Sequence, residues 1–438
     1  MSLLRLLKDR RANVAPMFAI AAIPLVGAMG AAVDYSRAAN IRAQLLAAAD
    51  AASVSSVAKS SVGLSKASSM TGDGSIADGA NDAVKLFNAE ITGKGGFTLT
   101  SATASMIKSG TTVTSTLDFT AQVSTSFMGI LGFNSMNIKG TATATNNMPL
   151  FIDFYLMLDN TPSMGIGATT ADISKMESNT SDKCAFACHD ESNSNDYYKL
   201  AKSLGVQMRI DVVRTATQQL MDTAKTTATF SNQFRMAIYT MGTSSKTAGL
   251  TTVQSLTSNL TTAKSAASAI DLMSIPYQNY KGDTQTDHPD VLKDLKNEIS
   301  KPGDGSSSSS PLKYVFFVSD GVTDRVNGSP GCSQTTTTST DPQTGTSYTR
   351  CMEPLNSSYC DDIKKKDIKI AVLYTTYMPL PTNGWYMTWI NPFASTIAKN
   401  MEACASPGLY FEVSPSQGIS EAMTALFKKA VSQARLSK

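Results

Sequence analysis

Histidine and charged residues are scarce in this sequence of 438 residues. A Ser-His-Asp hydrolase needs a histidine, and the chain has only His189 and His288; no strand-like segment leads into a Gly-x-Ser-x-Gly turn. Phosphate-loop and dinucleotide-binding motifs are also absent, which argues against ATP use. Charged residues make up 17% of the chain and the net charge is +3, so the composition indicates no nucleic-acid surface.

Aromatic residues are few and Ser and Thr abundant, a composition that suits an exported protein. The six cysteines lie in loop-like stretches and favour disulfides, hence an oxidising compartment. For the first two cysteines, Cys184 and Cys188, a zinc site is the weaker interpretation, because no second Cys/His pair nearby completes a tetrahedral set of ligands. The sequence does not determine the pairing. The arrangement favoured here joins Cys184 to Cys188, Cys332 to Cys351, and Cys360 to Cys404.

Residues 14–33 contain no charge and are long enough to cross a bilayer as a helix. The basic residues Arg5, Lys8, Arg10 and Arg11 precede them, which predicts a cytoplasmic N-terminus. The alternative is a signal peptide cleaved around residues 28–32, but the length of the span and the helical pattern that continues after it favour a retained anchor. We therefore expect a single-pass inner-membrane protein whose residues 1–33 are the basic flank and anchor, and whose bulk is periplasmic or extracellular.

Residues 34–147 change from a helical to a strand-like pattern. Residues 34–60 are Ala-rich, with apolar residues at three- and four-residue steps. Thr/Val-rich segments with a period of two follow between Phe97 and Asn146. A long helix packed on a small sheet is a pilin-like α+β module.

The residues Arg10-Arg11-Ala-Asn-Val-Ala-Pro-Met-Phe-Ala-Ile, followed by Ala32-Val-Asp-Tyr-Ser-Arg, resemble the TadE/TadG-like family of tight-adherence (Flp) pilus assembly. Ala12 and Met17 stand where processed pilins usually have Gly and Glu, which supports a stable anchor. The resemblance implies a role in pilus assembly.

Residues 148–438 alternate strand-like and helical segments. The strands are expected at 151–158, 234–240, 314–318, 368–374 and 409–413. This alternation predicts an α/β domain with a doubly wound, mostly parallel sheet. Polar insertions are expected at 165–207 and 324–358, and an aromatic loop, equally a contact patch or loop packing, at 378–393.

Hydroxyl and carboxyl side chains follow two of these strands. Asp159, Thr161 and Ser163 come directly after the first strand, and Asp320 follows the third. Such oxygen ligands suit Mg²⁺, Mn²⁺ or Ca²⁺, and ligands bind where the carboxyl ends of parallel strands meet loops. With Thr284 from an intervening loop, the set resembles the metal-ion-dependent adhesion site of von Willebrand factor A domains, with Thr161 where Ser is commoner. That resemblance implies an ion completed by an acidic side chain of a protein partner.

The function predicted from these features is a membrane-anchored, extracytoplasmic accessory of pilus assembly that binds a protein through a metal ion and is not an enzyme. Its partners are expected to be pilus or envelope components and, through residues 14–33, the inner membrane. A surface adhesin unrelated to pili is the alternative. A metal-dependent hydrolase is a weaker one, since it needs a general base such as Asp190, Glu191 or Asp324 near the ion.

Overall fold

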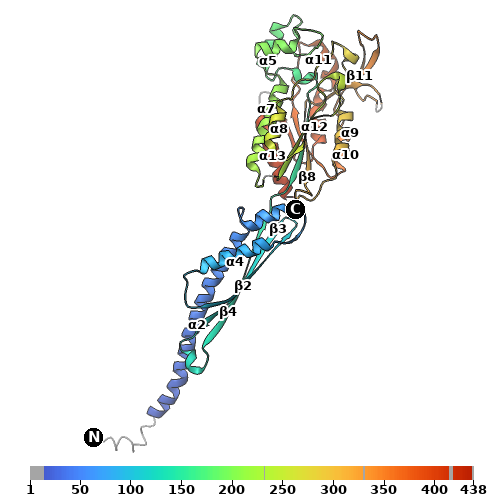
Figure 1. Ribbon diagram of the computed structural model, residues 1–438. Coiled ribbons are helices and arrows are strands. Elements are labelled where there is room, and N and C mark those ends of the chain that lie inside the picture. Colours follow the sequence, from blue (N-terminus) through green and yellow to red (C-terminus); the bar gives the residue numbers. More distant parts are fainter. Residues whose placement is uncertain (1–13, 231, 329–330, 414–417, 437–438) are drawn as a thin grey trace, which may run out of the picture. The chain divides into compact units, whose positions relative to one another are not determined.

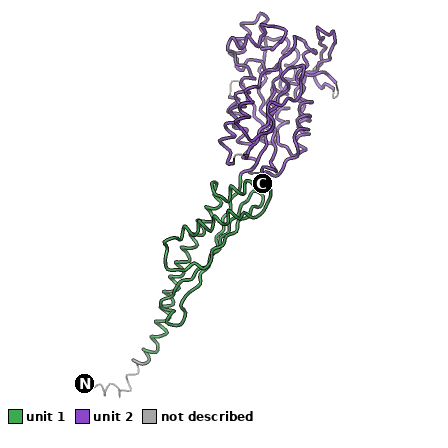
Figure 2. The backbone as a smooth tube through the Cα atoms, in the orientation of Figure 1, with its two compact units in different colours: residues 1–148 green, residues 149–438 purple. Residues whose placement is uncertain are grey.

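The computed structural model describes residues 14–230, 232–328, 331–413 and 418–436. The basic residues Arg5, Lys8, Arg10 and Arg11 lie outside this range. The chain forms two compact units, residues 1–148 (unit 1) and residues 149–438 (unit 2), shown in different colours in Figure 2.

Unit 1 consists of a long helix beside an antiparallel sheet. Helix α2 packs Leu45 and Ala49 against the sheet, and Phe87 of α4 stacks on Phe119 of β3. Before residue 34 the same helix exposes its apolar side chains, and it is the one described helix long and apolar enough to cross a membrane. The sheet has the order β1-β2-β3-β4. The elements are α2 (Val14–Ser56), α3 (Val62–Ser69), β1 (Gly74–Ser75), α4 (Ala77–Ile91), β2 (Thr98–Ser109), β3 (Thr112–Ser124), η1 (Met128–Leu131) and β4 (Ser135–Asn147).

Unit 2 is built on a six-stranded sheet of order β13-β12-β8-β5-β6-β7. All neighbouring pairs are parallel except β6 and β7. Every residue of β5 is buried, as expected for a parallel strand covered on both faces. The predicted mostly parallel α/β fold is therefore confirmed. The strands are β5 (Ile152–Leu158), β6 (Phe234–Thr240), β7 (Thr251–Thr257), β8 (Leu312–Ser319), β12 (Lys369–Thr375) and β13 (Tyr410–Val413).

Helices cover both faces of this sheet (Figure 1). Helices α7 (Arg209–Thr227), α8 (Leu260–Ala267) and α13 (Ile419–Leu436) pack on the face that carries Phe154 and Leu156. Helices α9 (His288–Glu298), α10 (Ser358–Lys364) and α12 (Ala394–Cys404) pack on the face that carries Tyr155 and Met157. Alternate residues of β5 thus serve two separate cores, because successive side chains of a strand point to opposite faces.

Elements outside this frame lie mainly in the two polar insertions, here called the first long connection (165–207) and the second long connection (324–358), and in the aromatic loop (378–393). The second connection forms a small antiparallel sheet of order β10-β11-β9. The elements are η2 (Pro162–Gly165), α5 (Thr170–Asn179), α6 (Tyr197–Leu204), η3 (Ser245–Thr247), η4 (Tyr280–Asp283), β9 (Val322–Val326), β10 (Thr335–Thr340), β11 (Ser347–Pro354), α11 (Gly384–Trp389) and η5 (Asn391–Phe393).

Candidate metal site at the sheet edge

Asp159 and Asp320 follow two adjacent parallel strands. Leu158 of β5 pairs with Val318 of β8, and the Asp159 N–H donates to the Val318 carbonyl at 2.9 Å. Both aspartates are completely buried. The carboxyl ends of these central strands therefore bring two carboxylates, distant in sequence, to one edge of the sheet.

The residues after Asp159 fold back onto its carboxylate. The Thr161 hydroxyl donates to Asp159 Oδ1 at 2.7 Å, the Thr161 N–H donates to the same oxygen at 3.0 Å, and the Ser163 hydroxyl lies 3.5 Å from that of Thr161. Asn160 points the other way and accepts a hydrogen bond from the Met241 N–H at 3.0 Å. The alternate spacing thus places the side chains of residues 159, 161 and 163 close together, while the side chain of residue 160 links the loop by a hydrogen bond to the residue that follows β6.

Asp159 is held in its ionised form by its neighbours. Burial by itself raises the pKa of this carboxyl, but His288 and the hydrogen bonds from Ser319 and the Thr161 N–H outweigh burial and lower the pKa. Ser319 Oγ donates to Asp159 Oδ2 at 2.7 Å, and His288 Nε2 lies 3.4 Å from the same oxygen.

Asp320 is in the opposite situation. Burial and repulsion from Asp159 raise its pKa to about 6, although Arg209 and a hydrogen bond from Ser163 oppose the rise. Arg209 is completely buried at the start of α7, and its Nη1 lies 3.4 Å from Asp320 Oδ2. Charge-assisted hydrogen bonds are usually about 2.7–2.9 Å long, so this arginine compensates Asp320 only partly.

The loop that contains Thr284, here called the third loop, is the remaining predicted source of a hydroxyl ligand. Thr284 donates to the Lys281 carbonyl at 2.8 Å, within its own turn. Thr286, two residues on, pairs through its backbone with Asp324 and lines a cavity with Ser163. The structure therefore brings Asp159, Thr161, Ser163 and Asp320 together, and it places Thr286 rather than Thr284 on the wall of that cavity.

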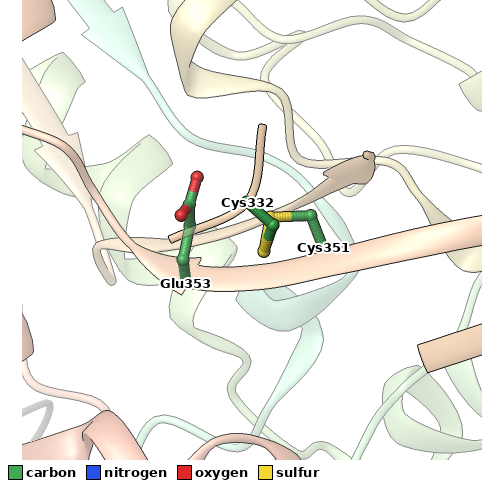
Figure 3. Close-up of side chains that lie close together, drawn as sticks. All are labelled: Cys332, Cys351 and Glu353. Carbon is green, nitrogen blue, oxygen red and sulfur yellow. A yellow bond between two sulfur atoms is a disulfide. The ribbon is translucent and has the colours of Figure 1, made fainter. Parts of the chain in front are cut away.

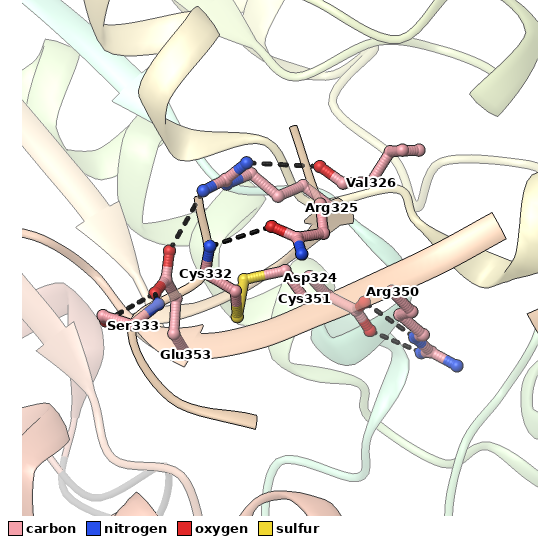
Figure 4. The surroundings of a disulfide bond; sticks show 9 residues. Asp324, Arg325, Val326, Cys332, Ser333, Arg350, Cys351 and Glu353 are labelled. Carbon is pink, nitrogen blue, oxygen red and sulfur yellow. Dashed lines mark hydrogen bonds and ion pairs between the residues drawn. A yellow bond between two sulfur atoms is a disulfide. The ribbon is translucent and has the colours of Figure 1, made fainter. Parts of the chain in front are cut away.

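A cavity of about 270 Å³ opens beside Ser163. The loop after β5, both long connections, the η4 turn and the aromatic loop contribute to its wall, so segments distant in the sequence gather beside Ser163. The lining residues include Pro162, Ser163, Cys184, Phe186, Cys188, Asp283, Thr286, Asp324, Arg350, Tyr377 and Trp385. Arg350 pairs with Asp324 (Figure 4) and lies over the Trp385 ring, 5.3 Å from its centre.

Two of the three expected disulfides are present. Cys332 is joined to Cys351, and Cys360 to Cys404. The expected Cys184–Cys188 bridge is not formed, and both residues are free thiols, with Cys188 on the cavity wall and its pKa raised to about 12 by burial. Glu353 lies beside the first disulfide (Figure 3), but both sulfur atoms are bonded to each other and cannot serve as thiolate ligands.

The donor set at the sheet edge fits a hard divalent cation. Two carboxylates and several hydroxyls converge, and oxygen ligands of this kind suit Mg²⁺ or Mn²⁺. Burial and the neighbouring Asp159 carboxylate raise the pKa of Asp320, and a divalent cation between the two carboxylates would favour the ionised form of both. Asp159, Ser163 and Asp320 are the residues that would hold such an ion, and the ion would supply a positive charge at this edge of the sheet.

The N-terminus matches a known family. Residues 12–59 fit the family described as "Putative Flp pilus-assembly TadE/G-like". The chain carries a TadE/G-like segment at its N-terminus. This confirms the resemblance drawn from the residues around Arg11 and Asp34, and the TadE/G-like segment includes all of α2.

Solved structures of low similarity include pilus proteins. A mutant of the PilB minor pilin from Streptococcus sanguinis matches with 9% identity and a TM-score of 0.34, covering 77% of each chain. The vWF domain of the type V pili tip protein Mfa5 from Porphyromonas gingivalis matches with 10% identity and a TM-score of 0.37, covering 66% of this chain and 97% of that one. Proximal thread matrix protein 1 from the mussel byssus, with a zinc-occupied MIDAS motif, matches with 13% identity and a TM-score of 0.33, covering 65% of this chain and 46% of that one. A comparison with curated proteins found no match.

Three neighbours of the site, Arg209, His288 and Ser319, were not predicted from the sequence. Arg209 begins α7 and His288 begins α9, so both come from helix starts that no motif links to the aspartates. Ser319 could have been predicted, because it immediately precedes Asp320 at the end of a buried strand.

The three carboxylates considered as general bases for a hydrolase already have hydrogen-bond partners. These are Arg350 for Asp324, Ser274 and Lys246 for Glu191, and Ser192 and Gln278 for Asp190.

Proposed function

We propose that this chain is a membrane-anchored, extracytoplasmic accessory of tight-adherence pilus assembly that binds a protein partner through a divalent cation. The observation that carries the pilus part is the match of residues 12–59 to the TadE/G-like family. Residues 14–33 are the anchor, with the N-terminus in the cytoplasm and the bulk of the chain outside the inner membrane.

Asp159, Ser163 and Asp320 hold the cation in this proposal, together with Thr161 and a threonine of the third loop. The convergence of two buried carboxylates and the Thr161 and Ser163 hydroxyls supports it. Mg²⁺ is the expected ion, with Mn²⁺ and Ca²⁺ as substitutes. The third-loop ligand is Thr284 by resemblance and Thr286 by its place on the cavity wall.

The charges around the site favour an acidic partner. Asp159 and Asp320 contribute two negative charges when ionised, and buried Arg209 contributes one positive charge. A divalent cation therefore leaves the buried group with a net positive charge. An Asp or Glu side chain entering from the cavity beside Ser163 offsets that charge and occupies an open position on the ion. No covalent chemistry is part of this function.

The test is cation-dependent binding of pilus and envelope components to the full-length protein. Wild-type protein should bind its partner in Mg²⁺ and release it in EDTA, and Asp159→Ala should not bind in either condition. Glu191→Gln is a matched control, because Glu191 is a carboxylate of the first long connection that pairs with Ser274 and Lys246 away from the proposed ion. Normal binding by Asp159→Ala contradicts the role of the ion. Recovery of the protein from the cell surface, and not from the inner membrane, favours the alternative of an adhesin unrelated to pili.

A further inference from the structure

The connection between β3 and β4 in unit 1 is an uncharged loop that exposes large apolar side chains. Residues 125–134 carry no charge, and several of their largest side chains face outward. Ile130 is 83% exposed, Phe133 60%, Leu131 58% and Phe127 46%. Exposed apolar patches of this kind mark contact with another apolar surface.

The position of this loop along α2 indicates what that surface is. A cavity of about 320 Å³ lies between Ala22, Ile23 and Val26 of the helix and Phe127, Ile130 and Leu131 of the loop. Phe127 also covers Gly30 so closely that a Cβ at residue 30 would lie 2.4 Å from the Phe127 Cβ. The loop therefore lies beside residues 22–30, which lie within the charge-free stretch 14–33.

Asp34 fixes the loop at this level. Its carboxylate accepts hydrogen bonds from the backbone N–H groups of Ser126, Phe127 and Met128 at 2.9, 2.9 and 2.7 Å. Asp34 is also the first charged residue after the apolar stretch. One side chain thus marks the end of the apolar stretch and attaches the loop to it.

The loop also satisfies much of its own backbone, which lowers the cost of moving these polar groups out of water. Besides the three N–H groups that reach Asp34, those of Thr125, Ile130, Gly132 and Phe133 donate to carbonyls within the loop. The Thr125 hydroxyl donates to the Phe133 carbonyl. These bonds leave the apolar side chains as the outward surface of the loop.

We propose that residues 125–134 insert into the extracytoplasmic leaflet of the membrane beside α2, as a second and non-spanning membrane contact. The inference rests on the proposed anchor: if residues 14–33 cross the bilayer, a loop held against residues 22–30 lies at the depth of the acyl chains. With a rise of about 1.5 Å per residue, Ile23 lies roughly 16 Å along the helix from Asp34. The helix side chains at the same level are equally exposed, with Ile23 at 71% and Val26 at 61%, so loop and helix form one continuous apolar surface.

Tryptophan quenching by lipids brominated on their acyl chains measures this contact. The full-length protein is first freed of its two tryptophans by Trp385→Phe and Trp389→Phe, and is then reconstituted into vesicles. Leu131→Trp reports on the loop, Ile23→Trp on the anchor, and Val54→Trp, an exposed position on the same helix, serves as the matched control outside the membrane. Ile130→Trp is a second loop reporter measured in parallel, and it carries the test alone if Leu131→Trp does not fold.

The proposal predicts that bromolipids quench Leu131→Trp at least half as strongly as Ile23→Trp, and leave Val54→Trp nearly unchanged. If Ile23→Trp is quenched but both loop tryptophans behave like Val54→Trp, the loop is outside the membrane and the proposal is overturned while the anchor stands. If Ile23→Trp is not quenched either, the anchor itself is wrong, and the loop proposal falls with it.

Discussion

The substitution Asp320→Asn separates two effects of the buried Asp320 charge: its destabilisation of the folded protein and its contribution to cation binding. The pKa of Asp320 is raised from 3.8 to about 6, and one pKa unit corresponds to about 1.4 kcal/mol, so ionised Asp320 costs the cation-free protein about 3 kcal/mol. The sign follows from the direction of the shift: between the unfolded and folded pKa values the folded protein binds the extra proton, and stability falls as pH rises through that window. At pH 8 the full cost is present. Asparagine removes the charge and keeps an acceptor for Arg209.

Thermal unfolding of the full-length protein in detergent at pH 8 tests this. In EDTA, Asp320→Asn should unfold at a higher temperature than wild type, by up to ~6 °C if each kcal/mol is worth about 2 °C in a unit of this size. In Mg²⁺ at a hundredfold excess over its dissociation constant, wild type should gain about 2.7 kcal/mol and the variant nothing. The expected pattern is a variant that is more stable without the cation and insensitive to it.

Asp159→Asn is the matched comparison at the same site. Because the surroundings lower the pKa of Asp159, its charge stabilises the folded state, and the variant should be less stable than wild type in EDTA. Two results refute the reasoning. One is a normal gain from Mg²⁺ in Asp320→Asn, and the other is a loss of stability in that variant at pH 8 without cation.

Further predictions concern the ligands, the pH and the thiols. If the cavity wall supplies the third-loop ligand, Thr286→Ala should weaken Mg²⁺ binding about tenfold or more, while Thr284→Ala has little effect. Titration calorimetry of the two variants with Mg²⁺ measures this difference. If Thr284→Ala has the larger effect, Thr284 is the ligand, as the resemblance implies. Below pH 6 a proton must leave Asp320 before the ion binds, so the Mg²⁺ dissociation constant should rise about fivefold from pH 6 to pH 5, and a flat profile over this range contradicts this role. Thiol labelling of the denatured, unreduced protein should modify Cys184 and Cys188 alone, as mass mapping would show; labelling of neither residue would mean that they are bridged.

The central strands are predictable from the sequence because they are buried on both faces and read as unbroken apolar runs. Strand β7 is not, because Thr251–Thr257 is a half-exposed edge strand of mixed composition. The small sheet of the second connection escapes for the same reason: β10 consists of Thr and Ser, with no apolar period. At the site, spacing alone predicts that Asp159, Thr161 and Ser163 point together. It cannot predict that Arg209, 111 residues away from Asp320, is buried against it, since that contact depends on how α7 packs.

Location of the cation itself tests the central claim most directly. Crystals of unit 2 or of the full-length protein grown with Mn²⁺ should show one anomalous peak at the sheet edge, about 2.1 Å from oxygens of Asp159, Ser163 and Asp320. The peak should be absent from crystals of Asp159→Asn. A wild-type crystal without a peak there, with Arg209 as the sole counter-charge of Asp320, would show that the two aspartates form a buried ion-pair cluster and hold no metal.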